Sequence, residues 1–149
     1  MPKLSLAFLV LLVIGAGCDA STAPAGADNL ASARALWDGQ HLQAYSYKVS
    51  RNCECVLGGR EMTVSVSNGS VVSAGYVDSG SAVEPSLLTY VLTVPDLFDL
   101  IQDALDRKAV YLAVRYDPIY GYPTRIDIDY SADAVDDEVS MSARELTIQ

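Results

Sequence analysis

The chain of 149 residues contains a single histidine, His41, and only three cysteines. One histidine argues against a histidine-based metal site and against a Ser-His-Asp triad. The sequence also lacks a glycine-rich phosphate loop, a G-x-S-x-G nucleophile elbow and an H-E-x-x-H motif. No familiar catalytic class is therefore indicated by its motifs.

Basic residues are scarce, because 10 Lys and Arg stand against 19 Asp and Glu and give a formal net charge of −9. A surface this acidic repels nucleic acid and anionic lipid headgroups, so no nucleic-acid partner is expected. It favours cations or a basic partner, or it is simply a well-solvated acidic surface.

Long hydrophobic runs are also missing, since the apolar run from Leu4 to Ile14 is shorter than the roughly 20 residues of a membrane-spanning helix. Lys3 precedes this run and three small residues follow it, as in a signal peptide. Cys18 comes directly after them, in the position that bacterial lipoprotein processing requires. We expect residues 1–17 to be removed and Cys18 to carry lipid. The alternative is an ordinary secretory signal, because Gly15 stands where lipoprotein signals usually have leucine.

Residues 18–27 contain the lipidated cysteine followed by small and polar residues with one proline, which predicts a flexible tether. Nine such residues span roughly 15–18 Å. Residues 28–149 then have the length of a single domain.

Periodicity predicts an α+β fold for this domain. The expected architecture is an antiparallel sheet of five to six strands with two helices packed on one face, in the order α-β-β-β-α-β-β-β. Thr93 and Asp96 form the capping-box pattern of the second helix, and Asn68-Gly69 is a strong hairpin signal. The helices are expected at 28–38 and 94–105, and the strands at 44–50, 61–67, 70–76, 109–116, 124–130 and 139–148.

Cys53 and Cys55 are the two thiols that remain once Cys18 is acylated, and an even pair outside the cytoplasm predicts a disulfide. Residues two apart in a regular strand have Cα atoms roughly 6.5 Å apart. Because this is near the upper limit for a disulfide, the chain must bend there. A redox or soft-metal role is the alternative.

The acidic segment from Asp127 to Glu138 has oxygen donors at the spacing of a twelve-residue calcium loop. However, Ala132 stands where the sharp turn needs glycine, so a solvated acidic edge is the alternative. The candidate ligands are Asp127, Asp129, Ser131, Asp133 and Glu138.

A second candidate site is the aromatic turn that follows the strand at 109–116. Aromatic side chains at a rigid turn can form a binding patch, or they can cap the end of the core. The residues of this candidate surface are Tyr116, Asp117, Tyr120, Tyr122 and Arg125.

The order of several segments resembles a family of bacterial lipoproteins that carry a domain of unknown function. The resemblance rests on Trp37, the Tyr45-Ser46-Tyr47 strand, the C-x-C pair, the start of the second helix, the YDPxYGYP segment at 116–123 and the acidic stretch ending at Glu138. It covers nearly all of the mature chain. It implies an exported α+β domain and carries over no catalytic or binding residue.

These observations predict a lipoprotein of the bacterial cell envelope, anchored in the bilayer through Cys18 and facing the extracytoplasmic side. We expect a non-catalytic domain that binds a protein or an envelope component, with no cofactor. The alternatives are a calcium-binding module and a hydrolase using carboxylates such as Asp136 and Glu138.

Overall fold

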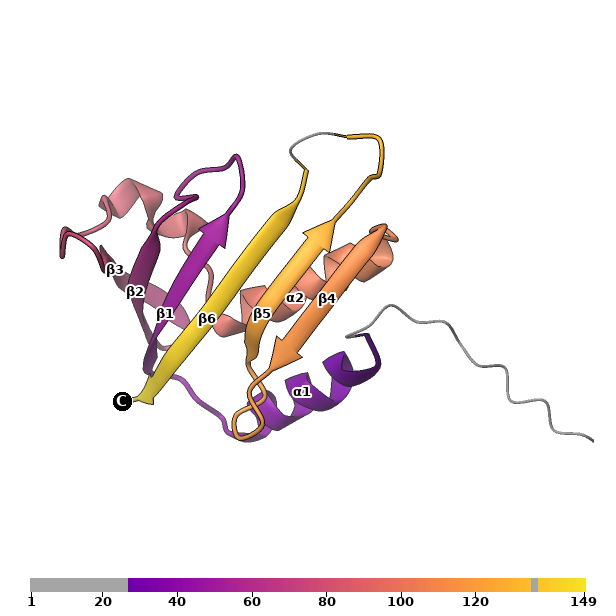
Figure 1. The fold of residues 1–149 in the computed structure, drawn as a ribbon. Coiled ribbons are helices and arrows are strands. Elements are labelled where there is room, and N and C mark those ends of the chain that lie inside the picture. Colours follow the sequence, from indigo (N-terminus) through magenta and orange to yellow (C-terminus); the bar gives the residue numbers. More distant parts are fainter. Residues whose placement is uncertain (1–26, 135–136) are drawn as a thin grey trace, which may run out of the picture.

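The computed structural model describes residues 27–134 and 137–149 (Figure 1). The predicted signal peptide, Cys18 and nearly all of the tether lie outside the described residues. The elements are α1 (Ala27–Gly39), β1 (Tyr45–Asn52), β2 (Glu61–Ser67), β3 (Ser70–Tyr76), η1 (Pro85–Tyr90), α2 (Val94–Asp106), β4 (Tyr111–Tyr116), β5 (Pro123–Asp129) and β6 (Val139–Ile148).

The six strands form one antiparallel sheet in the order β3-β2-β1-β6-β5-β4. The α+β class and the sheet are confirmed, but the expectation of two helices is wrong. A third helix, the 3₁₀ helix η1, occupies Pro85–Tyr90 beside β3. Its six residues are too few to show a helical repeat of apolar side chains, so periodicity gave no signal for it.

The start of α2 and the β2–β3 turn lie where short sequence motifs predicted them. The Thr93 side chain accepts a hydrogen bond from the Asp96 amide, and the Asp96 carboxylate accepts one from the Thr93 amide at 2.7 Å. This capping box satisfies two amide groups that the start of α2 would otherwise leave unpaired. At the β2–β3 turn, Asn68 and Gly69 both have positive φ, as the predicted hairpin requires.

The core lies between the sheet and α2, which Figure 1 shows behind the strands. Alternate residues of β1 point into it, and Tyr45 and Tyr47 are almost fully buried. The Tyr45 hydroxyl accepts a hydrogen bond from the Val94 amide at 3.0 Å, and the Tyr47 hydroxyl donates one to the Leu92 carbonyl. Trp37 of α1 packs edge-on against Tyr45, with ring centroids 5.2 Å apart. These contacts hold α1 and the start of α2 against the central strand.

The helix α1 lies beside α2 near the β4 side of the sheet (Figure 1). Arg34 of α1 pairs with Asp99 of α2 at 2.5 Å and also lies over the Phe98 ring. Among the described residues, no helix is long and apolar enough to span a bilayer.

Candidate functional site

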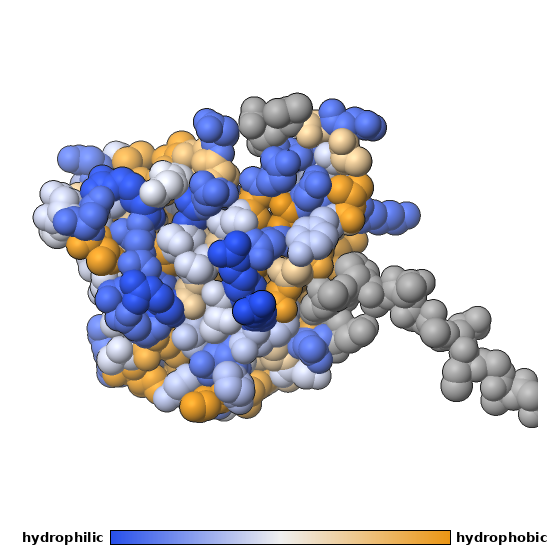
Figure 2. All heavy atoms as spheres, in the orientation of Figure 1, coloured by the Kyte–Doolittle hydropathy of each residue, from blue (hydrophilic) through white to orange (hydrophobic). Residues whose placement is uncertain are grey.

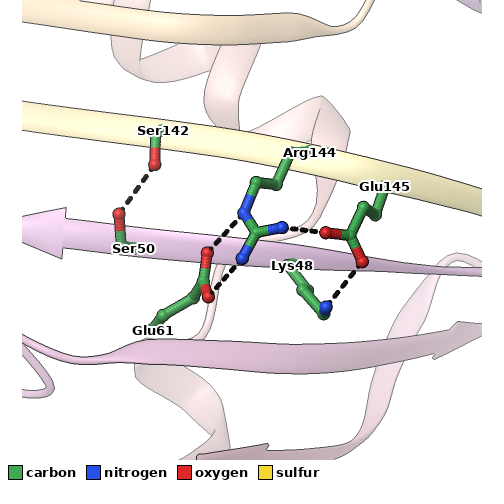
Figure 3. A network of polar contacts seen from close by, with 6 residues as sticks. All are labelled: Lys48, Ser50, Glu61, Ser142, Arg144 and Glu145. Carbon is green, nitrogen blue, oxygen red and sulfur yellow. Dashed lines mark hydrogen bonds and ion pairs between the residues drawn. The ribbon is translucent and has the colours of Figure 1, made fainter. Parts of the chain in front are cut away.

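The second face of the sheet carries no described helix and is polar. In Figure 2, which looks onto this face, hydrophilic side chains run across its middle. Arg144 of β6 donates two hydrogen bonds of 2.7 Å to Glu61 of β2, reaching across β1 (Figure 3). Arg144 also pairs with Glu145, whose other oxygen lies 2.5 Å from the Lys48 ammonium group. The hydrogen bonds from Arg144 hold the pKa of Glu61 below its usual range. The charges in the middle of this face are therefore engaged with one another.

The acidic segment that was predicted as a calcium loop begins within β5, which ends at Asp129, and continues beyond that strand. Asp127 lies on the polar face of β5, where it accepts hydrogen bonds from Arg125 at 2.8 Å and from Ser140 at 2.5 Å. These hydrogen bonds, with that of Arg125 the stronger influence, lower the pKa of Asp127. The Asp129 carboxylate instead accepts the Ser131 amide at 3.1 Å, and Ser131 accepts the Asp133 amide at 3.3 Å.

Glu138, the last residue of this segment, lies beside Glu54 and Cys53, where it borders a hollow of about 210 Å³. Residues 135 and 136 are outside the described residues, so Asp136 is not placed relative to Glu138. Within the described parts of the chain, no three His, Cys, Asp or Glu side chains gather closely enough to hold a metal ion. Calcium binding by this segment stays a prediction.

Cys53 and Cys55 form a disulfide just beyond the end of β1, with their Cα atoms 5.3 Å apart. The chain bends there as the sequence predicts, because the Cys55 amide donates to the Cys53 carbonyl at 2.9 Å. Gly58 approaches the carbonyls of both cysteines so closely that a Cβ would not fit. The predicted pairing is thus present in a compact loop at one end of the sheet.

The residues of the predicted aromatic surface do not all face the same way. Tyr122 is buried, and Tyr116 is half-buried with its ring stacked on Phe98 at 6.3 Å. Asp117 serves the turn itself, because its carboxylate accepts the Ile119 and Tyr120 amides at 2.9 and 2.7 Å. Tyr116 and Tyr122 therefore mainly complete the end of the core.

Arg125, the last residue of that predicted surface, lies on the polar face of β5 directly opposite Arg115 of β4. A hollow of about 630 Å³ opens beside the two guanidinium groups, and we call it the polar hollow. The residues that define it are Tyr111, Ala113, Arg115, Thr124, Arg125 and Asp127. Arg125 is neutralised by Asp127 at 2.6 Å, whereas Arg115 forms no ion pair within the described residues.

A second hollow of about 540 Å³ lies on the helix side of the same strand, between β4 and α1, and we call it the apolar hollow. Its apolar lining residues are Ala33, Leu36, Val114, Tyr116, Pro118 and Gly121, and the polar residues Asn29, Ser32, Arg115 and Asp117 border it. Asn29, Val114 and Arg115 line both hollows, so the two meet at the outer edge of β4.

The sequence analysis missed Arg115. An alternating strand that ends at Tyr116, together with the turn at 117–123, already indicates that Arg115 and Arg125 face one another. That this pair lies at a border of the sheet follows only from the strand order, in which β4 is last.

Comparison with known proteins gives one family. A family model described as a family of unknown function, DUF6174, matches residues 29–148, which is almost the whole described domain. No curated protein and no solved structure matches the chain. The chain therefore belongs to the DUF6174 family.

Proposed function

We propose that this protein is a lipid-anchored domain of the bacterial cell envelope that binds a protein partner without chemical turnover. The signal-like residues 1–17 and Cys18 support the anchor. Two or more acyl chains hold a protein on a membrane stably, because each buried CH₂ contributes about 0.8 kcal/mol. The short, small-residue segment that follows is suited to present the domain close to the headgroups.

The observation that carries the binding role is the edge of β4, which no described strand pairs with and which has a hollow on each side. An edge strand presents unpaired main-chain donors and acceptors, and proteins commonly cover or blunt such edges. At the other end of the sheet, β3 is covered, because Ala82 bridges to Gly75 and the Val83 amide donates to the Ala74 carbonyl at 2.8 Å. Such cover is absent from β4 within the described residues, which favours this border as the interaction surface.

The anchor is tested by substituting Cys18→Ser in the full-length protein and separating soluble from membrane fractions. We expect the domain to leave the membrane fraction, and the native protein to show an acyl mass increment on its first mature residue. The double substitution Cys53→Ser and Cys55→Ser is the matched control and should stay with the membrane. A native protein without the mass increment would contradict lipidation.

The binding role is tested by photo-crosslinking in cells. A photoreactive residue at Ala113 lies beside the β4 edge, and one at Val72 of β3 is the control, since Val72 is 56% exposed at the opposite end of the sheet. We expect the same envelope protein to be captured repeatedly from position 113 and not from position 72. Failure to capture any protein from position 113 across growth conditions would contradict the proposal.

A further inference from the structure

We infer that the partner adds an extended segment to β4 as a seventh strand, and that this segment alternates acidic with apolar side chains. The inference rests on the proposed binding function and names the chemistry of the partner. It follows from the main chain of β4, from the two hollows and from the charge of Arg115.

The outer edge of β4 offers main-chain donors and acceptors to which an extended segment can hydrogen-bond. β4 has six residues and pairs only with β5 among the described strands. At about 3.3 Å per residue its free edge is roughly 20 Å long. No residue of Tyr111–Tyr116 is proline, so every outward-facing amide can donate a hydrogen bond. Strand addition to such an edge is a common way to bind an extended peptide, and its affinity comes mainly from main-chain hydrogen bonds.

The two hollows lie on opposite faces of the sheet, which indicates that the bound segment alternates polar and apolar side chains. Successive side chains of an added strand point to opposite faces of the sheet. On one face they enter the polar hollow beside Arg115 and Thr124, and on the other face they enter the apolar hollow beside Leu36 and Val114. A segment that alternates polar and apolar side chains therefore fits both hollows at once.

Arg115 indicates that the polar side chains of the added segment are negatively charged. It lies directly opposite Arg125, and like charges in this position are destabilising. Asp127 engages Arg125 through both of its oxygens, at 2.8 and 2.6 Å, while Arg115 has no ion pair in the described parts of the chain. Arg115 acts on Asp127 only through its charge, so a carboxylate on the added strand would give it a direct ion pair and a charge-assisted hydrogen bond. The surface around Arg115 is positive although the whole chain has a net charge of −9. This surface therefore favours binding of an acidic segment.

Two other occupants fit less well. The segment before α1, residues 19–26, has the sequence DASTAPAG, with a proline and no large apolar side chain. A second copy that paired β4 with β4 would bring no carboxylate, because the strand sequence YLAVRY contains none. A separate acidic and apolar segment is thus the occupant that these residues favour.

The test uses full-length protein in mild detergent and a labelled peptide of about eight residues, which is long enough to cover the six residues of β4 with one to spare at each end. The peptide alternates glutamate with valine and is blocked at both ends. Fluorescence anisotropy measures binding, and amide hydrogen exchange locates it. We expect protection of the β4 amides and an affinity that Arg115→Gln weakens about tenfold, as for loss of a hydrogen bond to a charged group. Arg60→Gln is the matched control, since Arg60 pairs with Asp78 near the β3 end of the sheet, and it should leave the affinity nearly unchanged.

Two control peptides separate the contributions of charge and main chain. A peptide with lysine in place of glutamate, and one with N-methylated amides facing β4, should each bind about tenfold more weakly than the parent. Equal binding by either control, or unchanged exchange of the β4 amides, would overturn the inference. So would protection of β4 by a second copy in concentrated protein without peptide. If these peptide results fail while crosslinking from Ala113 captures a partner, the proposed function stands and only the inference is wrong.

Discussion

The backbone of Gly121 lies directly against the carbonyl oxygen of Ala33 in α1. A Cβ at this position would also lie 3.1 Å from the Leu36 Cβ, and Gly121 has a φ of +79°. The turn between β4 and β5 therefore contacts α1 at a position that only glycine can occupy without strain. Gly121, Ala33 and Leu36 all line the apolar hollow.

Substituting Gly121→Ala is expected to destabilise the domain by about 2–4 kcal/mol, from backbone strain and from the displaced helix together. Urea unfolding measures the change. Gly80→Ala is the matched control, because Gly80 has a φ of +68° but a Cβ there would meet nothing within 4 Å. It should cost about 1 kcal/mol. Equal losses in the two variants would show that the contact with α1 contributes nothing.

The hydroxyl of Tyr47 donates a hydrogen bond to the Leu92 carbonyl inside the core. Tyr47→Phe leaves this carbonyl without the donor, so we expect a loss of about 1–2 kcal/mol in the free energy of unfolding. Tyr90→Phe is a suitable control, since Tyr90 is 51% exposed and should tolerate the change within about 0.5 kcal/mol. Unaltered stability of the Tyr47 variant would mean that water replaces the lost donor.

Burial raises the pKa of Tyr116 to about 12, although the nearby charge of Arg34 opposes the shift. The side chain titrates near pH 10 in the unfolded chain. Between these two values the unfolded state releases its proton first, so this contribution to stability is complete below about pH 10 and is lost as the pH rises through about 12.

We therefore expect Tyr116→Phe to lose less stability than the native protein between about pH 9 and about pH 11.5. The comparison is made by urea unfolding at both pH values, with Tyr111→Phe as the control because Tyr111 is 56% exposed. A pH dependence identical to that of the native protein would contradict the assignment to Tyr116.

The disulfide between Cys53 and Cys55 is expected in the native protein and should contribute little to its stability. It closes a loop with only Glu54 between the cysteines, and the loop-entropy relation gives only about 1.5 kcal/mol for so short a loop. Intact-mass analysis with alkylation under non-reducing conditions reports the oxidation state, and unfolding of the Cys53→Ser and Cys55→Ser double variant reports the stability. Two freely alkylated thiols in protein taken from the envelope would overturn the disulfide and favour a metal-binding role.

If the acidic segment is a solvated edge and not a calcium site, calcium and magnesium should raise the melting temperature of the domain equally. The Asp127 carboxylate is already held by Arg125 and Ser140, so screening of the acidic surface is the effect that both ions share. Thermal melts in millimolar chloride salts of each ion test this expectation. A larger shift with calcium that Asp127→Asn removes would instead support the predicted cation site.

The sequence by itself determined the features that depend on neighbours along the chain. The capping box of α2 needs only Thr93 and Asp96, three residues apart, and the β2–β3 turn needs only Asn68 and Gly69. Alternation along β1 assigned Tyr45 and Tyr47 to the same face for the same reason, since strand periodicity is local. The expectation of an anchored, exported protein also comes from a continuous segment of sequence.

Only the tertiary structure decided which residues form the candidate site. Strand order is set by long-range packing, and it placed β4 rather than β5 or β6 at a border of the sheet. The approach of α1 to this border depends on Gly121 and Ala33, which are far apart in sequence and carry no shared pattern. Arg115 is an ordinary polar residue of an alternating strand until the fold sets it opposite Arg125, on the last strand of the described sheet. Its chemistry therefore arises from the packing of distant segments.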